Sequence, residues 1–190
     1  PLPPRKRLPG SVGQGTGVQV AIMDDNGKLL PSGTQGEVVI QGKNVTRGYH
    51  NNPEANAVSF TDGWFRTGDQ GILDADGYLT LVGRLKELIN RGGEKISPRE
   101  IDEALLTHPA VAEAVCFGVP DTKYGEEVAA AVVLKGTASE ADLTAHCRER
   151  LAAFKVPKTI HLVTQIPRTA TGKIQRRVVA AAFTGGADQK

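Results

Sequence analysis

The stretch that decides the fold spans residues 83–97 and reads GRLKELINRGGEKIS. It separates a β-rich first part from a second part in which helices and strands alternate. Arg84 is suited to hold a phosphate or ribose oxygen, because its guanidinium forms strong, directed hydrogen bonds to anions. Gly92 and Gly93 let a backbone approach a ligand closely. The alternative interpretation is an ordinary linker with a glycine turn.

The sequence before this stretch predicts β structure. Its apolar runs are short and are bounded by glycine and aspartate clusters, which is typical of strands and turns. Asp76-Gly77 supplies the positive φ that a hairpin turn needs. The expected elements are strands over residues 18–23 and 37–40, a hairpin over 71–82, and a loop-rich segment over 42–68 with one short helix opened by Asn51-Asn52-Pro53.

The sequence after it predicts an α+β domain of about 100 residues, an ordinary domain size. Ser97-Pro98-Arg99-Glu100 predicts a capping box with proline at the first helical position. His108-Pro109 ends that helix. The other expected elements are strands over residues 111–119, 127–134 and 160–163, a helix from Ser139, and a last helix from near Lys173 to Ala180.

Composition excludes several classes of protein. The 190 residues are 23% charged and 39% hydrophobic, which fits a globular protein and neither a disordered chain nor a coiled coil. The sequence contains no run of about 18 apolar residues, so it predicts no membrane-spanning helix. Two cysteines and four histidines without ligand spacing predict no disulfide framework and no metal site. A net charge of +2 and 5% aromatic residues argue against nucleic-acid binding.

Positive charge is concentrated near the C-terminus, in a segment without acidic residues. This basic stripe suits a polyanion such as the phosphates of a nucleotide or coenzyme, although a solvated surface is the alternative. Its six cations are Lys155, Lys158, Arg168, Lys173, Arg176 and Arg177.

Two short motifs could carry chemistry. Residues 63–69 read GWFRTGD and predict a tight turn that aims the Asp69 carboxylate at a ligand, such as the paired hydroxyls of a ribose. A turn-forming aspartate without a ligand is the alternative. Residues 167–176 read PRTATGKIQR and place Lys173 on a loop before a helix, where its ammonium can act as a point charge toward a phosphate. The glycine pattern of a Walker loop is missing.

The order of these motifs resembles the C-terminal part of the adenylate-forming, AMP-binding enzymes over essentially all 190 residues. The stretches that carry the resemblance are residues 64–69, 83–89, 118–127 and 168–173. Within that family the chain looks like an acyl-CoA synthetase, and residues 87–97 and 172–177 are closest to the oxalate–CoA ligase type. Luciferase-like members often have lysine where Asn90 stands, so no role of that lysine is carried over.

The resemblance implies a domain organisation and a reaction. Residues 1–85 would be the β-rich C-terminal piece of the large ATP-binding domain, and residues 86–190 the small mobile domain that carries the catalytic lysine. The full-length enzyme would be an acid–thiol ligase. Its substrates would be ATP with Mg²⁺, a carboxylic acid (oxalate for the oxalyl-CoA type) and coenzyme A.

The resemblance also implies roles for individual residues. Lys173 would be catalytic, and Asp69, Arg84 and Lys173 would bind the nucleotide. Lys86 would be the hinge about which the small domain rotates between the two half-reactions. The residues expected at the CoA site are Gly92, Gly93, Glu94 and Lys155.

The chain lacks features that the family carries upstream, namely the Ser/Thr/Gly-rich phosphate loop and the adenine segment. We therefore expect a fragment that needs its N-terminal domain and is inactive alone. Two alternatives are an adenylation enzyme that loads a carrier protein and a non-catalytic partner-binding module. The last residues are not a peroxisomal signal, so the expected location is the cytoplasm.

Overall fold

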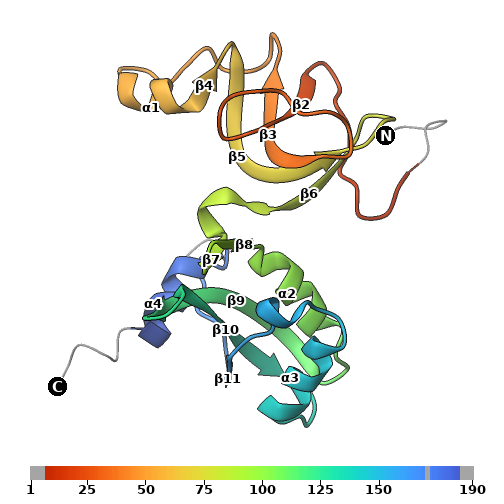
Figure 1. Ribbon diagram of the computed structural model, residues 1–190, viewed down its shortest axis with the longest axis vertical. Coiled ribbons are helices and arrows are strands. Elements are labelled where there is room, and N and C mark those ends of the chain that lie inside the picture. The colour runs from red at the N-terminus through yellow and green to blue at the C-terminus, as the bar shows by residue number, and fades with distance from the viewer. Residues whose placement is uncertain (1–6, 170–171, 185–190) are drawn as a thin grey trace. The chain divides into compact units, whose positions relative to one another are not determined.

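The computed structural model describes residues 7–169 and 172–184 of the chain. The chain forms two compact units, residues 1–86 and 87–190, each with its own sheet (Figure 1). Strands and helices occur in both units, as the expected α+β class requires. None of the helices in the described ranges is long and apolar enough to cross a membrane.

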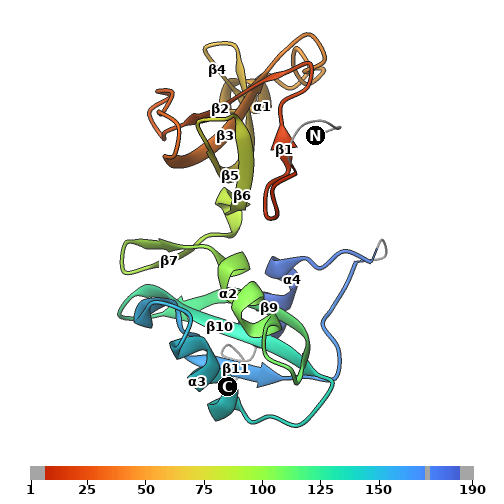
Figure 2. The ribbon, with the colours of Figure 1, turned by 90° about the vertical axis from the view of Figure 1, so that its right-hand side faces the viewer.

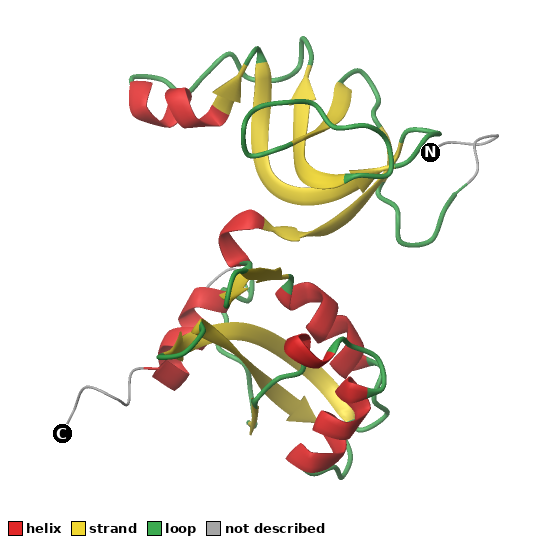
Figure 3. Cartoon of the chain, in the orientation of Figure 1, coloured by secondary structure: helices red, strands yellow, loops and turns green. Residues whose placement is uncertain are grey.

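The first unit is a six-stranded sheet whose paired strands are all antiparallel (Figure 3). Its order is β1-β6-β5-β3-β2, and the short strand β4 pairs with β5. Ile22, Met23, Val38 and Val39 form its buried apolar centre. The elements are β1 (Gly13–Gln14), β2 (Gln19–Met23), β3 (Gln35–Gln41), α1 (Pro53–Ser59), β4 (Phe60–Thr61), β5 (Trp64–Leu73), β6 (Tyr78–Arg84) and the 3-10 turn η1 (Leu85–Glu87).

Strand β5 is longer than the sequence indicates. The predicted turn at Asp69 is wrong, because Thr67, Gly68 and Asp69 all lie within this strand. The register of β5 shifts on both sides, between Glu37 and Val39 on β3 and between Gln70 and Gly71 within β5 itself. The Thr-Gly pair thus marks a bulge inside the sheet, where a glycine at positive φ is as useful as in a turn.

The second unit is a five-stranded sheet with helices on both faces (Figure 2). Its path is β11-β10-β7-β8, and the long strand β9 pairs with β10. Helices α2 and α3 pack on one face, whereas α4 covers the other face through Val179. The elements are β7 (Ile89–Arg91), β8 (Glu94–Ile96), α2 (Pro98–Leu106), β9 (Val111–Asp121), β10 (Gly125–Leu134), α3 (Glu140–Arg148), η2 (Ala153–Lys155), β11 (Thr159–Leu162) and α4 (Arg176–Thr184).

Apolar side chains on both faces of β9 and β10 explain why helices cover the sheet from both sides. In β10, Val128, Ala130 and Val132 face the α2 and α3 side, whereas Ala129 and Ala131 face α4. Because successive side chains of a strand point to opposite faces, a continuous apolar run is the sequence of a strand buried on both sides.

Two helix starts differ from the predictions. Ser97 is the N-cap of α2, but its side chain makes no capping hydrogen bond. The predicted capping box is therefore wrong, and the Glu100 carboxylate accepts hydrogen bonds from Lys155 Nζ at 2.7 and 2.8 Å instead. The complete capping box lies at α3, between Ser139 and Asp142. Helix α4 begins at Arg176, three residues after the predicted start near Lys173.

Both cysteines lie in the core of the second unit. Cys116 on β9 and Cys147 on α3 are free thiols, each with 0% of its surface exposed. Burial raises the pKa of the Cys116 thiol well above its usual value, because the interior disfavours a thiolate. Both side chains act as small apolar groups.

Candidate functional site

Asp69 and Arg84 face each other on adjacent strands. They are register partners on β5 and β6, and Arg84 Nε lies 2.7 Å from Asp69 Oδ1. The side chains are 27% and 62% exposed, respectively, so a ligand can reach both. The structure thus joins two of the predicted nucleotide-binding residues in one ion pair.

A hydrogen-bonded bulge sets the position of Asp69. Its backbone N–H donates to Thr67 Oγ1 at 3.1 Å, and that hydroxyl donates to the Val38 carbonyl at 2.7 Å. The Gly68 N–H donates to Glu37 Oε1 at 2.9 Å, with Gly68 at a φ of 73°. The motif residues are therefore fixed by strand β3 as well as by their own strand.

Glu37 and Arg66 belong to this arrangement, and the sequence analysis missed them as a pair. Arg66 Nε donates to Glu37 Oε2 at 2.7 Å, and the Glu37 side chain is only 6% exposed. A buried carboxylate requires such a partner. A hollow of about 340 Å³ is lined by Glu37, Arg66 and Gly68, and also by Arg84 and Lys86. In the sequence, the one sign of this buried pair is that Glu37 stands at the start of an otherwise apolar strand.

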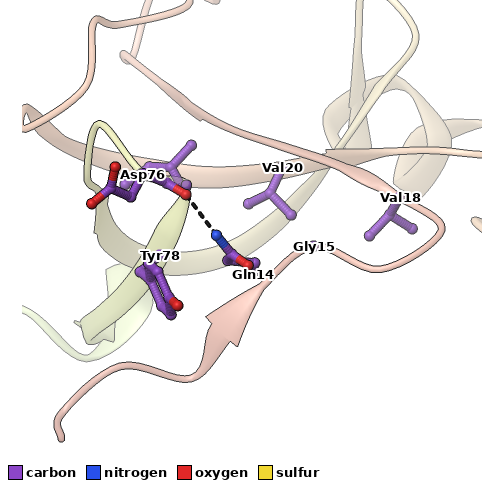
Figure 4. A pocket seen from close by; sticks show the side chains of 8 residues that line it. Gln14, Gly15, Val18, Val20, Asp76 and Tyr78 are labelled. Atoms are coloured by element: carbon purple, nitrogen blue, oxygen red, sulfur yellow. Dashed lines mark hydrogen bonds between the residues drawn. The ribbon is translucent and has the colours of Figure 1, made fainter. Parts of the chain in front are cut away.

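A larger hollow lies elsewhere in the first unit (Figure 4). It has a volume of about 570 Å³ and is lined by Val18 and Val20 on one side and by Asp76 and Tyr78 on the other. Gln14 also lines it, beside Asp76 and Tyr78, and its Nε2 donates to the Asp76 carbonyl at 2.7 Å (Figure 4). None of the predicted site residues lines this hollow.

The predicted hinge residue, Lys86, is exposed and lies in the middle of η1. The first compact unit ends at this residue. The next residue, Glu87, accepts a hydrogen bond from Arg176 Nε at 3.0 Å and so is held by the second unit.

The predicted CoA-site glycines form the tight turn between β7 and β8. Gly92 and Gly93 have φ values of 59° and 94°, and the Gly92 N–H donates to the Tyr124 carbonyl at 2.8 Å. A Cβ on Gly92 would meet the Tyr124 ring at 3.2 Å, whereas at Gly93 nothing lies within 4 Å. Glu94 follows directly, exposed at the start of β8.

Tyr124 is a second residue that the sequence analysis did not single out at this turn. The Arg91 guanidinium lies 4.1 Å and the Lys123 ammonium 4.9 Å from its ring centre. The two cations lower the pKa of the Tyr124 hydroxyl, with Lys123 contributing most. Arg91 is itself held by Glu127 through two hydrogen bonds, so one of the two cations beside the Tyr124 ring is paired with a carboxylate.

Lys173 lies on a loop that folds back on itself before α4. The Thr169 N–H donates to the Lys173 carbonyl at 2.9 Å, and the Lys173 N–H donates to Thr169 Oγ1 at 3.2 Å. Arg168 and Ile174 form an antiparallel bridge that closes the loop. Lys173 is exposed. The motif residues Ala170 and Thr171 lie outside the described residues.

Most cations of the basic stripe are neutralised by carboxylates from other elements. The pairs are Lys155–Glu100, Lys158–Asp121, Arg168–Glu113, and Arg176 with both Glu87 and Asp102. Among the described residues, no ion pair involves the side chains of Lys173 or Arg177. The stripe is therefore not one uncompensated surface. A phosphate at Lys155 would have to compete with Glu100.

No cluster of three or more His, Cys, Asp or Glu side chains within the described ranges could hold a metal ion. Mg²⁺ that accompanies ATP is commonly bound by one or two carboxylates together with the phosphates of the nucleotide, so such a cluster is not required for it. We assign that ion no step and treat it only as the companion of ATP.

Comparison with known proteins places this geometry in a family. Residues 100–173 match the AMP-binding enzyme C-terminal domain, and residues 1–50 match the AMP-binding enzyme family. The chain therefore belongs to the AMP-binding, adenylate-forming enzymes, of which it carries the C-terminal part. This confirms the resemblance seen in the motifs.

The relatives it matches include CoA ligases. It is 56% identical over 188 residues to an oxalate–CoA ligase of Arabidopsis thaliana, covering 96% of this chain and 36% of that protein. It is 54% identical to an oxalate–CoA ligase of Saccharomyces cerevisiae, covering 100% and 36%. The crystal structure of ATP-bound MatB from Rhodopseudomonas palustris matches with a TM-score of 0.89 at 37% identity, covering 95% and 37%. The chain thus spans little more than a third of these relatives.

Proposed function

We propose that the full-length enzyme is an AMP-forming acid–thiol ligase that activates a small carboxylic acid, with oxalate as the first candidate. The observation that carries this proposal is the state of Lys173. It is exposed, and no ion pair in the described part of the chain engages its ammonium, whereas Arg168 and Arg176 on either side are both paired. A cation kept available on a braced loop is suited to meet a negatively charged reaction centre.

The reaction has two steps. In the first, a carboxylate oxygen of the acid bonds to the α-phosphorus of ATP, and pyrophosphate leaves. In the second, the CoA thiol loses its proton, its sulfur bonds to the acyl carbon, and AMP leaves with the electron pair of the broken C–O bond. Negative charge accumulates on the oxygens around the α-phosphorus in the first step. Lys173 would stabilise that charge more in the transition state than in the ground state.

The remaining residues would bind and position the substrates. Asp69 would accept hydrogen bonds from the ribose hydroxyls, with Arg84 beside it near the ribose and phosphate. Lys86 would be the hinge that exchanges the Lys173 loop for the Gly92-Gly93 turn. That turn has no side chain to block a thiol that enters as an extended chain.

The CoA site would extend from this turn to Glu94 and Lys155. In this assignment residues 1–85 belong to the large ATP-binding domain and residues 86–190 form the small mobile domain. The identity with two oxalate–CoA ligases supports oxalate as the acid. We expect the chain alone to be inactive, since the phosphate loop and most of an acyl pocket are not in it.

The test uses the full-length enzyme with ATP, Mg²⁺ and a panel of acids that includes oxalate, malonate and succinate. AMP release that requires free CoA, fastest with oxalate, is the expected result. Pyrophosphate exchange without CoA-dependent AMP release would instead indicate an enzyme that loads a carrier protein. If no acid of the panel supports ATP turnover and the enzyme binds no nucleotide, a partner-binding module is favoured. The 190-residue chain alone is the matched inactive control.

A further inference from the structure

One arginine of the basic stripe is held by three separate segments of the second unit. Arg176 Nε donates to Glu87 at 3.0 Å, Nη1 donates to the Cys116 carbonyl at 2.8 Å, and Nη2 lies 2.7 Å from Asp102. These partners lie in η1, β9 and α2. With 18% of its side chain exposed, Arg176 is the most buried cation of the stripe's ion pairs.

Asp102 also connects Arg176 to strand β9. The Asp102 side chain is 14% exposed and also accepts a hydrogen bond from the Cys116 N–H at 2.5 Å. A planar guanidinium holds its donors in fixed directions and so can bind these three acceptors in one geometry, whereas the three donors of a lysine ammonium rotate about a flexible stem. Removing one partner of a buried pair leaves an uncompensated charge, so any displacement that separates Arg176 from Asp102 is unfavourable.

Arg176 is also close to Lys173 along the chain. It is the first residue of α4, and only Ile174 and Gln175 separate the two. The other end of the loop is fixed by Arg168, whose Nη2 donates to Glu113 at 2.6 Å. Both arginines therefore attach the loop to β9, which carries Glu113 and Cys116.

From this geometry we propose that Arg176 is a positioning residue for Lys173. It touches no substrate. It fixes the start of α4 against the core and against Glu87, the residue after the hinge, so that the Lys173 ammonium is presented in one place. This inference rests on the proposed function, because it takes Lys173 as the residue that acts.

The first test needs no activity and uses the 190-residue chain. Backbone amide order parameters are measured by NMR in wild type, in Arg176→Met and in Arg176→Met with Asp102→Asn. The double variant leaves no unpaired buried carboxylate at position 102 and serves in case the single one does not fold. We expect the order parameters of Gly172 and Lys173 to fall, while those of Ala130 and Val132 in β10 stay near the rigid value of about 0.85. Unchanged values at Gly172 and Lys173 in a folded variant would overturn the proposal.

A matched control is Arg99→Gln. It also removes one arginine–carboxylate pair, since Arg99 Nε lies 2.8 Å from Glu103, but this pair is exposed and lies within α2. It should leave the loop amides and adenylation unchanged.

The second test uses adenylation by the full-length enzyme, followed as pyrophosphate exchange. Arg176→Met should lower the maximal rate by roughly 10- to 100-fold, the scale of a displacement of about 1 Å, with KM for ATP within about threefold. In a Lys173→Ala background the same change should cost less than about threefold, because the residue it positions is gone. Equal losses in both backgrounds would contradict positioning through Lys173. A wild-type enzyme that never turns over ATP would refute the proposed function, and the NMR measurement would then decide whether Arg176 fixes the loop.

Discussion

The bulge of β5 and the loop before α4 both carry predicted nucleotide-binding residues, but they differ in whether their charged side chains form ion pairs. At the bulge, Asp69 faces Arg84 and Glu37 faces Arg66, so every charge has a partner within the sheet. On the loop, Lys173 is exposed, and its ammonium takes part in no ion pair within the described residues. Paired charges set a geometry and contribute to stability, whereas an unpaired charge contributes little to the fold and is available to a ligand. Substitutions in the two regions should therefore affect different measurements.

The largest effect is expected at Lys173. Lys173→Ala should lower adenylation by the full-length enzyme by about 10²–10³-fold, the usual cost of losing one charge-stabilising group, while KM for ATP changes by less than about threefold. Thermal unfolding should not change, because the side chain is exposed. Pyrophosphate exchange measures the adenylation rate, and a melting curve measures the thermal stability. An adenylation rate within about threefold of wild type would exclude the assigned role.

Lys86→Pro tests whether Lys86 is the hinge. Proline fixes φ, so the variant should keep adenylation but lose thioester formation by about tenfold or more. Acyl-CoA formation and pyrophosphate exchange are measured on the same preparation. Lys86→Ala is the control, because it removes the same side chain without fixing the backbone. Equal loss of both half-reactions would place the hinge elsewhere.

Glu37→Gln tests the paired region. It leaves Arg66 without its carboxylate in a half-buried place and should lower the free energy of unfolding of the first unit by about 1–3 kcal/mol. The only tryptophan, Trp64, lies on β5, so its fluorescence during urea unfolding reports on this unit. Glu54→Gln, at an exposed position on α1, is the control. A loss no larger than that of the control would mean that the pair adds nothing to stability.

The smallest effect concerns the capping box of α3. Hydrogen bonds from the Ser139 backbone and side chain lower the pKa of Asp142 below its usual value of 3.8. A carboxylate with a lowered pKa stabilises the fold fully above the unfolded value, and that contribution disappears as the pH falls through the folded value. The melting temperature of Asp142→Asn should therefore lie below that of wild type near neutral pH, with the difference shrinking below pH 3.8. Glu140→Gln in the same turn is the control, and a difference independent of pH would contradict the assignment.

Local patterns predicted most of the elements because these depend on near neighbours in sequence. The strands over residues 18–23, 111–119 and 127–134 are confirmed to within two residues at each end. A short apolar run indicates a buried strand whichever helix or strand packs against it, so the local pattern is enough to identify these strands.

The errors arose where a distant residue decides the local structure. Asp69 lies in a strand because Glu37 and Val38 bind the backbone and side chain of the preceding residues. At Ser97 the predicted capping box is absent, and Glu100 is instead bound by Lys155, which is 55 residues away. The basic stripe looked uncompensated for the same reason, since its carboxylate partners belong to other elements. No local motif records such pairings.

The burial of both native thiols has a practical consequence. Maleimide reagents need an accessible thiolate, and neither Cys116 nor Cys147 offers one. Cysteines placed at exposed positions, such as Thr80 in the first unit and Thr137 in the second, would thus react selectively in the otherwise unaltered 190-residue chain. In the full-length enzyme, a fluorophore pair attached there would turn the motion proposed about Lys86 into a measurable distance.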